Sequence, residues 1–153
     1  MSFLESQWLL IIHVLAATVW TGGHLVLATV ILPTVLRDRS VSRLLAFESA
    51  YERIGMPALL LQVVTGVALA YRLIPDVSAW FDWSNPIARA IIAKLTLLLL
   101  TVVFALDARF RVIPGLTERG LVDMAWHIVP VTVLSVLFVV VGVSFRGGGL
   151  GAF

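Results

Sequence analysis

The chain has 153 residues, of which 60% are hydrophobic and only 13% charged, and its mean hydropathy is +1.03. A soluble domain usually has about twice that share of charged residues. The lack of cysteine excludes disulfide scaffolds, zinc ribbons and thiolate-bound iron–sulfur clusters. The apolar content also excludes an intrinsically disordered chain. The remaining class is a small integral membrane protein.

Four long apolar segments cover residues 6–36, 54–74, 86–111 and 121–145. A hydrocarbon core of ~30 Å needs ~20 apolar residues in an α-helix, so each segment is long enough to cross a bilayer. We therefore expect an all-α fold in which residues 1–153 form a single domain. That domain is an antiparallel bundle of four transmembrane helices.

The connections between these segments contain further patterns. Residues 40–53 have the pattern of an amphipathic segment that leads into the second span, with a bend at Pro57. Asn85 followed by Pro86 predicts an N-cap and a first turn for the third span. Residues 146–153 are rich in glycine and predict a flexible tail. Three aromatic residues before the third span are typical of an interfacial belt: Trp80, Phe81 and Trp83.

The distribution of basic residues predicts the orientation in the membrane. The first and third connections contain seven arginines: Arg37, Arg39, Arg43, Arg53, Arg109, Arg111 and Arg119. The opposite side has three: Arg72, Arg89 and Arg146. The positive-inside rule then places both termini outside, which is the periplasm in a bacterial inner membrane. The expected partner of these arginines is the lipid bilayer with its anionic headgroups, and no nucleic acid partner is expected.

All three histidines and the single lysine fall inside the expected spans, where ionisable residues usually have a functional role. His13 and His24 are eleven residues apart, so steps of ~100° bring both imidazoles to one helix face, ~16 Å apart along the axis. Trp20 shares that face. By depth, His24 and His127 belong to an inner layer, whereas His13 and Lys94 belong to an outer layer near the termini.

The inner layer is the first candidate for a metal or cofactor site. Neutral imidazoles are ligands for copper and for haem iron, so we expect His24 and His127 to approach each other and hold one metal jointly. For copper, Met124 is a candidate third ligand. For haem b, the ring would need a slot lined by Gly23 and Ala28.

Other polar residues have alternative interpretations. In the outer layer, His13 and Lys94 form a second candidate for binding a metal or cofactor. A histidine could also simply donate a hydrogen bond to a carbonyl of the next helix. Gln62 is interpreted as an interhelical hydrogen-bonding residue rather than as part of a site. Asp107 and Arg111 are expected to form an i,i+4 ion pair at the membrane surface.

Three segments of the sequence resemble the copper resistance protein D (CopD) domain family. They are residues 13–23 (HVLAATVWTGG), 93–100 (AKLTLLLL) and 109–114 (RFRVIP). The resemblance extends over nearly the whole chain, although larger family members have additional helices. It implies a membrane domain of the bacterial inner membrane with a role in copper transport or homeostasis.

The His-x6-Trp-x-Gly opening at His13, together with a lysine in the third span, also resembles HemJ-type protoporphyrinogen oxidases. Those are small four-helix proteins associated with haem b, and His13 and Lys94 fall on the positions considered functional in them. His127-Ile-Val-Pro130 differs from the Asn-Glu-x-Pro segment of that family. This departure replaces an acidic pair by an imidazole that can bind a metal.

Three functions therefore remain open from the sequence. The chain could bind copper through intramembrane histidines, as the first resemblance implies. It could instead be a haem b protein that transfers electrons or oxidises a porphyrinogen, and the sequence leaves open whether the chain is an enzyme. It could also be an assembly subunit without a cofactor. Four helices enclose little space, so transport would favour a homo-oligomer.

Overall fold

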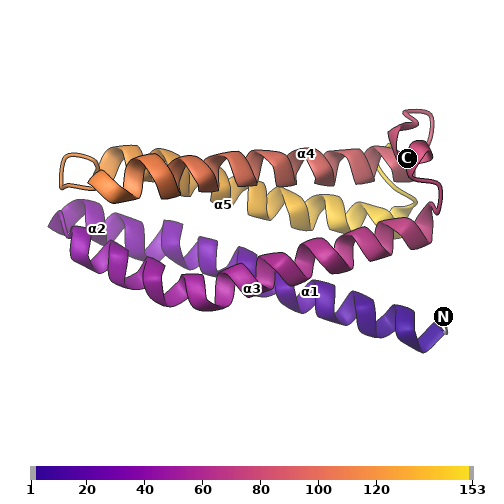
Figure 1. Ribbon diagram of the computed structural model, residues 1–153, viewed down its shortest axis with the longest axis horizontal. Coiled ribbons are helices and arrows are strands. Elements are labelled where there is room, and N and C mark those ends of the chain that lie inside the picture. The colour runs from indigo at the N-terminus through magenta and orange to yellow at the C-terminus, as the bar shows by residue number, and fades with distance from the viewer. Residues whose placement is uncertain (1–2, 152–153) are drawn as a thin grey trace.

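The computed structural model describes residues 3–151, and within them all regular structure is helical. The α-helices are α1 (Phe3–Val26), α2 (Leu32–Asp38), α3 (Val41–Leu73), α4 (Pro86–Asp107) and α5 (Leu121–Ser144). Together with the short helical turns beside them, they form four stretches that are long and apolar enough to cross a membrane: Ser6–Asp38, Val41–Leu73, Pro86–Gly115 and Leu121–Gly147. The predicted all-α, four-helix membrane fold is confirmed (Figure 1).

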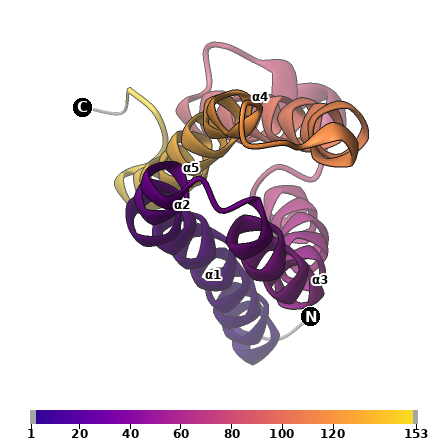
Figure 2. The same ribbon diagram turned by 90° about the vertical axis from the view of Figure 1, so that its left-hand side faces the viewer.

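The four stretches lie along one common direction and alternate up and down (Figure 1). The start of α1 and the end of α5 lie at one end of the bundle, which we call the terminal end. The α2–α3 turn and the connection before α5 lie at the other, which we call the loop end. Around the bundle, α3 packs on α1, α1 on α5, and α5 on α4 (Figure 2).

Helix α3 begins earlier than the second span expected at 54–74. Residues 40–53 do not form a separate segment, because α3 continues from Val41 to Leu73 with Pro57 inside it. A helix of 33 residues is ~50 Å long, which exceeds the ~30 Å hydrocarbon core. The first turns of α3 therefore extend beyond the hydrocarbon region at the loop end.

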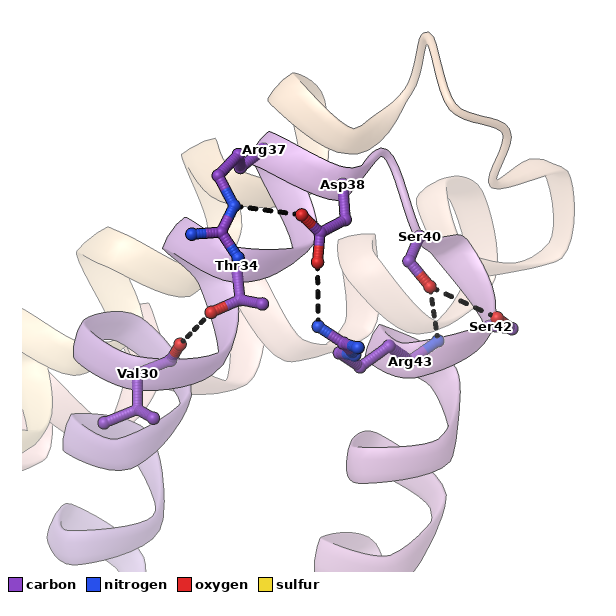
Figure 3. Close-up of polar contacts among 7 residues, drawn as sticks. All are labelled: Val30, Thr34, Arg37, Asp38, Ser40, Ser42 and Arg43. Carbon is purple, nitrogen blue, oxygen red and sulfur yellow. Dashed lines mark hydrogen bonds and ion pairs between the residues drawn. The ribbon is translucent and has the colours of Figure 1, made fainter.

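The turn between α2 and α3 is short and well defined by hydrogen bonds (Figure 3). Arg39 adopts a left-handed conformation with φ 49°, which ends α2, and the Ser40 hydroxyl accepts the Arg43 N–H at 3.3 Å to cap α3. Asp38 accepts hydrogen bonds from Arg37 Nε at 2.9 Å and from Arg43 Nη1 at 3.0 Å. These exposed ion pairs orient the turn rather than supply much stability.

Two widened π-turns interrupt the helices at the loop end. One covers Leu27–Ile31 between α1 and α2, and the other covers Ala108–Val112 after α4. Each ends two residues before a proline, Pro33 or Pro114. A proline ring clashes with the carbonyl four residues earlier, and a widened turn moves that carbonyl away. The prolines thus account for the π-turns.

The apolar core differs from expectation at one tryptophan. Trp80 is buried against Ile74 and Ala88, and its Nε1 donates to the Ile74 carbonyl at 2.8 Å. The prediction that Trp80 belongs to an interfacial belt is wrong, because its indole finds both an apolar pocket and a hydrogen-bond acceptor inside the protein. Phe81 and Trp83 are exposed, as expected for a belt.

The end of the chain is tied to the start of α4. As predicted, the Asn85 side chain caps α4 by accepting the Ile87 N–H at 2.9 Å. The expectation of a flexible tail is wrong over residues 146–151, because the Leu150 N–H donates to the Pro86 carbonyl at 3.0 Å and Arg89 Nε donates to the Leu150 carbonyl at 2.9 Å.

Candidate functional site

Buried polar side chains are concentrated in the middle of the bundle. They are His13, Thr21, His24, Gln62, Thr65, Thr101, Thr132 and Ser135. Two of the hydroxyls connect α1 to α5. Thr21 donates to the Ser135 carbonyl at 3.2 Å, and Thr132 shares its one hydrogen between the Ile128 carbonyl of its own helix at 2.8 Å and the His24 carbonyl at 3.2 Å. Because lipid offers no hydrogen bonds, polar groups on membrane helices turn inward, and here they surround α1.

His13 lies at the contact between α1 and α3, toward the terminal end. Its Nδ1 is 2.9 Å from the Thr65 hydroxyl oxygen, and its ring packs on Gly66, where a side chain would crowd it. The Thr65 hydroxyl donates its own hydrogen to the Leu61 carbonyl. Thr65 therefore accepts the hydrogen of Nδ1–H, and a neutral His13 keeps its lone pair on Nε2.

His24 lies further along the same face of α1, also against α3. Its Nδ1 is 2.9 Å from the Trp20 carbonyl, which can only accept, so His24 donates from Nδ1. The Tyr51 hydroxyl donates to the same carbonyl at 2.9 Å, and its ring meets the imidazole edge to face at 5.6 Å. Like His13, a neutral His24 keeps its lone pair on Nε2.

His127 lies between α4 and α5 at the loop end and has a different environment. Its Nδ1 donates to the Asp123 carbonyl at 2.8 Å, and its Nε2 is 2.6 Å from Asp107 Oδ2. The same carboxylate oxygen accepts Arg111 Nη2 at 2.9 Å, which confirms the predicted Asp107–Arg111 ion pair. Both ring nitrogens of His127 therefore already have oxygen partners, so a metal at His127 would have to displace the Asp123 carbonyl or the Asp107 carboxylate.

The surroundings of His127 are also more open than those of the α1 histidines. A groove of about 560 Å³ runs between the connection before α5 and the first turns of α5, and His127 forms part of its wall. His127 and Asp107 side chains are 12% and 33% exposed, respectively. This contact is therefore near the membrane surface at the loop end.

The two histidines of the expected inner layer bind different partners. Thr132 faces α1, because it bonds the His24 carbonyl, and His127 precedes Thr132 by five residues. Five steps of ~100° leave the two side chains about 140° apart around α5, which turns His127 toward α4. Joint binding of one metal by His24 and His127 would require His127 to leave Asp107.

The remaining predicted site residues, Lys94 and Met124, have no hydrogen bond to these rings within the described part of the chain, although the charge of Lys94 is close enough to act on His13. Lys94 extends along α5, with Nζ 5.6 Å from the centre of the Phe145 ring and beside Gly142. Met124 packs in an apolar cluster at the loop end, among residues that include Leu27 and Leu44. These contacts of Lys94 and Met124 include no histidine within the described part of the chain.

Tyr51 is a functional candidate that the sequence did not single out. Its ring covers Gly23 so closely that a methyl group there would overlap it, and it thereby occupies the space the haem alternative needed at Gly23. Its ring also stacks with Phe47 at 5.9 Å. The pattern that could have revealed it is a stripe of α3 residues at helical spacing that faces α1: Tyr51, Gly55, Ala58, Gln62 and Thr65.

Within residues 3–151, no group of three or more His, Cys, Asp or Glu side chains is arranged to hold a metal ion. Any metal at the α1 histidines would therefore have fewer than three side-chain ligands of these types. Such sites differ from the closed sites of structural metals, which have four protein ligands.

Four membrane-length helices around a polar core define a small multi-pass membrane protein. The sequence profile of the family described as copper resistance protein D matches residues 45–145, which is more than half of the chain. The chain belongs to the copper resistance protein D family. No curated protein and no solved structure matches it significantly. The matched range includes Lys94, Met124 and His127, and it begins after His13 and His24.

Proposed function

We propose that this protein handles copper inside the membrane through His13 and His24, with copper as the species it moves. Family membership supports a role in copper resistance. The observation that carries the assignment to these two residues is their shared hydrogen-bond pattern. In each, Nδ1–H is held by an oxygen acceptor, which fixes the tautomer and directs Nε2 as the ligand atom.

The few protein ligands at His13 and at His24 favour transient binding of copper during transport over its storage. Copper bound by a single imidazole is held more weakly than in a site with three or four protein ligands. A pathway requires binding strong enough for entry and weak enough for exit, spread over several sites. Two imidazoles ~16 Å apart on one face of α1 meet this requirement.

We also propose that the membrane is a bacterial inner membrane and that the terminal end faces the periplasm. The basis is the excess of arginine at the loop end, together with the family. In this orientation His13 is the site nearer the periplasm. Homo-oligomerisation stays part of the proposal, because it would enclose more space than four helices alone.

Copper binding by the detergent-purified protein tests the assignment. Cu(I) would be loaded without oxygen and measured by elemental analysis and by competition with a chelator. We expect His13→Ala and His24→Ala each to lose one bound ion, and the double variant to lose both. His127→Ala is the matched control and should retain the wild-type copper content.

Two results would contradict the assignment. A double variant with the copper content of the wild type would exclude both α1 histidines. Loss of the same ion in His24→Ala and His127→Ala would instead support the joint inner site. An absorption spectrum of the same samples would reveal a haem by its Soret band.

A further inference from the structure

Two buried side-chain atoms in the middle of the bundle have no hydrogen-bond partner among the described residues. They are the indole nitrogen Nε1 of Trp20 on α1 and the amide oxygen Oε1 of Gln62 on α3. The two residues are only 6% and 7% exposed, so neither side chain reaches lipid or bulk water. An unpartnered polar group in such surroundings is strongly unfavourable, because hydrocarbon offers no replacement for the missing hydrogen bond. Each atom therefore needs a partner.

The register between α1 and α3 places both residues between the two histidines. Thr65 of α3 bonds His13, whereas Tyr51 of α3 bonds the Trp20 carbonyl and packs on His24. Gln62 is one turn from Thr65 on the side of Tyr51, and side chains of an α-helix lean toward its N-terminus. Its amide thus leans toward the level of Trp20.

The neighbours on this stripe of α3 leave room for a small ligand. Between Tyr51 and Gln62 the residues that face α1 are Gly55 and Ala58, both buried and both small. At Gly55 the Tyr51 ring already fills the space, because a Cβ there would lie 3.0 Å from it. The small side chain next to Gln62 on this stripe is therefore Ala58, and room for a ligand beside the amide lies there.

The chemistry of the two atoms selects the ligand. Trp20 Nε1–H can only donate, and the carbonyl end of Gln62 can only accept. One molecule that accepts from the first and donates to the second satisfies both. Water does this in the smallest volume, and it also suits the amide if oxygen and nitrogen exchange places. A metal ion does not fit, because an indole N–H has no lone pair to offer.

We infer that Trp20 and Gln62 form an internal water-binding site between His13 and His24, next to the Trp20 ring that packs on His24 at 4.4 Å. This hydration site rests on its own residues and takes water whether or not the protein binds copper. Its role does rest on the proposed function: a copper ion that passes from one imidazole to the other would find a water ligand between them, where protein ligands are missing. The site thus makes the α1–α3 contact polar along the whole interval between the two histidines.

The test is nuclear magnetic resonance of the full chain in detergent micelles, with the tryptophan indoles labelled with nitrogen-15. We expect the Trp20 indole N–H to show a cross-peak to a long-lived water. The matched control is Trp80, which is equally buried but donates to the Ile74 carbonyl and should show no such cross-peak. In Gln62→Leu the Trp20 cross-peak to water should be lost, while Gln62→Glu should retain it.

Several outcomes would overturn the inference. If wild-type Trp20 shows no water cross-peak, the site does not exist, and this holds even if no Gln62 variant folds. A downfield indole signal without a water cross-peak would indicate a direct bond from Trp20 to Gln62. A cross-peak that persists in Gln62→Leu would exclude Gln62 as a partner.

The role of this water in copper handling is tested separately. Copper movement into proteoliposomes should be slower in Gln62→Leu than in the wild type, with copper binding at His13 and His24 unchanged. Thr18→Val is the matched control, because Thr18 is an exposed α1 residue whose hydroxyl bonds its own helix. Equal rates of copper movement in Gln62→Leu and Thr18→Val would contradict the role of the water in transport but not the existence of the water site. Absence of copper binding in the wild type would contradict only the proposed function.

Discussion

The contact between α1 and α3 and the contact between α4 and α5 both contain buried or half-buried histidine, but they use it differently. On α1, His13 and His24 each donate from Nδ1 to one oxygen, and Nε2 keeps its lone pair. Between α4 and α5, both ring nitrogens of His127 have oxygen partners, the Asp123 carbonyl at one and the Asp107 carboxylate at the other. The first arrangement leaves one ring nitrogen for the copper that we propose, whereas the second uses both ring nitrogens in contacts within the protein.

This difference shows that the partner of the second ring nitrogen decides what an intramembrane histidine can do. The sequence predicts the same depth in the membrane for His24 and His127. In the structure the Asp107 carboxylate lies beside His127 and changes the chemistry of that ring. The predictions below test this contrast between the two contacts.

The largest effect is expected at the Asp107–His127 contact. Asp107→Ala removes the acceptor of both His127 and Arg111. Loss of one partner of a fully buried pair costs roughly 3–5 kcal/mol, and because Asp107 is one-third exposed we expect about 2 kcal/mol. Unfolding in denaturant would measure this, with Arg111→Ala as the control, since its side chain is 74% exposed. Equal stabilities for the two variants would show that His127 does not depend on Asp107.

The next effect concerns the acceptor of His13. Thr65→Val keeps the shape of the side chain and removes the oxygen that holds Nδ1–H. Loss of such a partner reduces metal affinity by 10–100-fold in general, and for a neutral hydroxyl we expect roughly tenfold weaker Cu(I) binding at His13. Chelator competition would measure it, and His24 should be unaffected. Wild-type affinity at both histidines would mean that the tautomer of His13 is not set by Thr65.

A smaller effect is expected where Tyr51 covers α1. Gly23→Ala places a methyl group against the Tyr51 ring, whereas Gly22→Ala meets nothing within 4 Å. The contacted atoms are at the far end of the Tyr51 side chain, so the ring can shift away from the added methyl group. We therefore expect Gly23→Ala to lower the free energy of unfolding by about 1 kcal/mol, at the low end of the cost of overpacking. Gly22→Ala should be at least as stable as the wild type, because alanine favours a helix. Similar melting temperatures for both variants would argue against the close packing of Tyr51.

The smallest effect lies outside both contacts, in the connection between α3 and α4. The hydroxyl and the N–H of Ser78 donate to Asp76 and lower its pKa below the usual value, and Ser84 lowers the pKa of Asp82 in the same way. A carboxyl with a lowered pKa stabilises the fold above its unfolded pKa of ~3.9 and loses that contribution as pH falls through the folded value.

We therefore expect a slight drop in melting temperature as pH falls below about 4, and less of a drop in a Ser78→Ala, Ser84→Ala double variant. Thermal scans at closely spaced pH values would detect it. A drop of the same size in both proteins would assign it to other carboxyl groups.

The sequence predicted those features that depend on local order along the chain. Charge-free runs located the four membrane helices, Asn85 and Pro86 located the start of α4, and the spacing of Asp107 and Arg111 predicted their ion pair. In each case the partners are within four residues or the signal is simple hydrophobicity. Such signals do not depend on how the helices are rotated against one another.

The partners of the histidines could not be predicted in this way. Depth from the sequence put His24 and His127 at one level, but the rotation of α5 about its axis turns His127 toward Asp107. That rotation is set by packing of α5 on both α1 and α4, including the hydrogen bond of Thr132 to α1. Tyr51 was missed because it lay in a segment expected to precede the membrane span.

The tail bound to α4 has a mechanical consequence. Because Leu150 bonds Pro86 and Arg89 at the terminal end, and His127 bonds Asp107 at the loop end, α4 and α5 are fastened at both of their ends. They form one stiff half of the bundle. The other half, α1 with α3, joins it through the apolar cluster that includes Leu27, Leu44 and Met124, through the Glu52–Arg109 ion pair, and through the hydroxyl-to-carbonyl bonds between α1 and α5. Sliding of one half along the other would have to break these contacts, and it would shift the α1 histidines past α5 while leaving their partners on α3 in place.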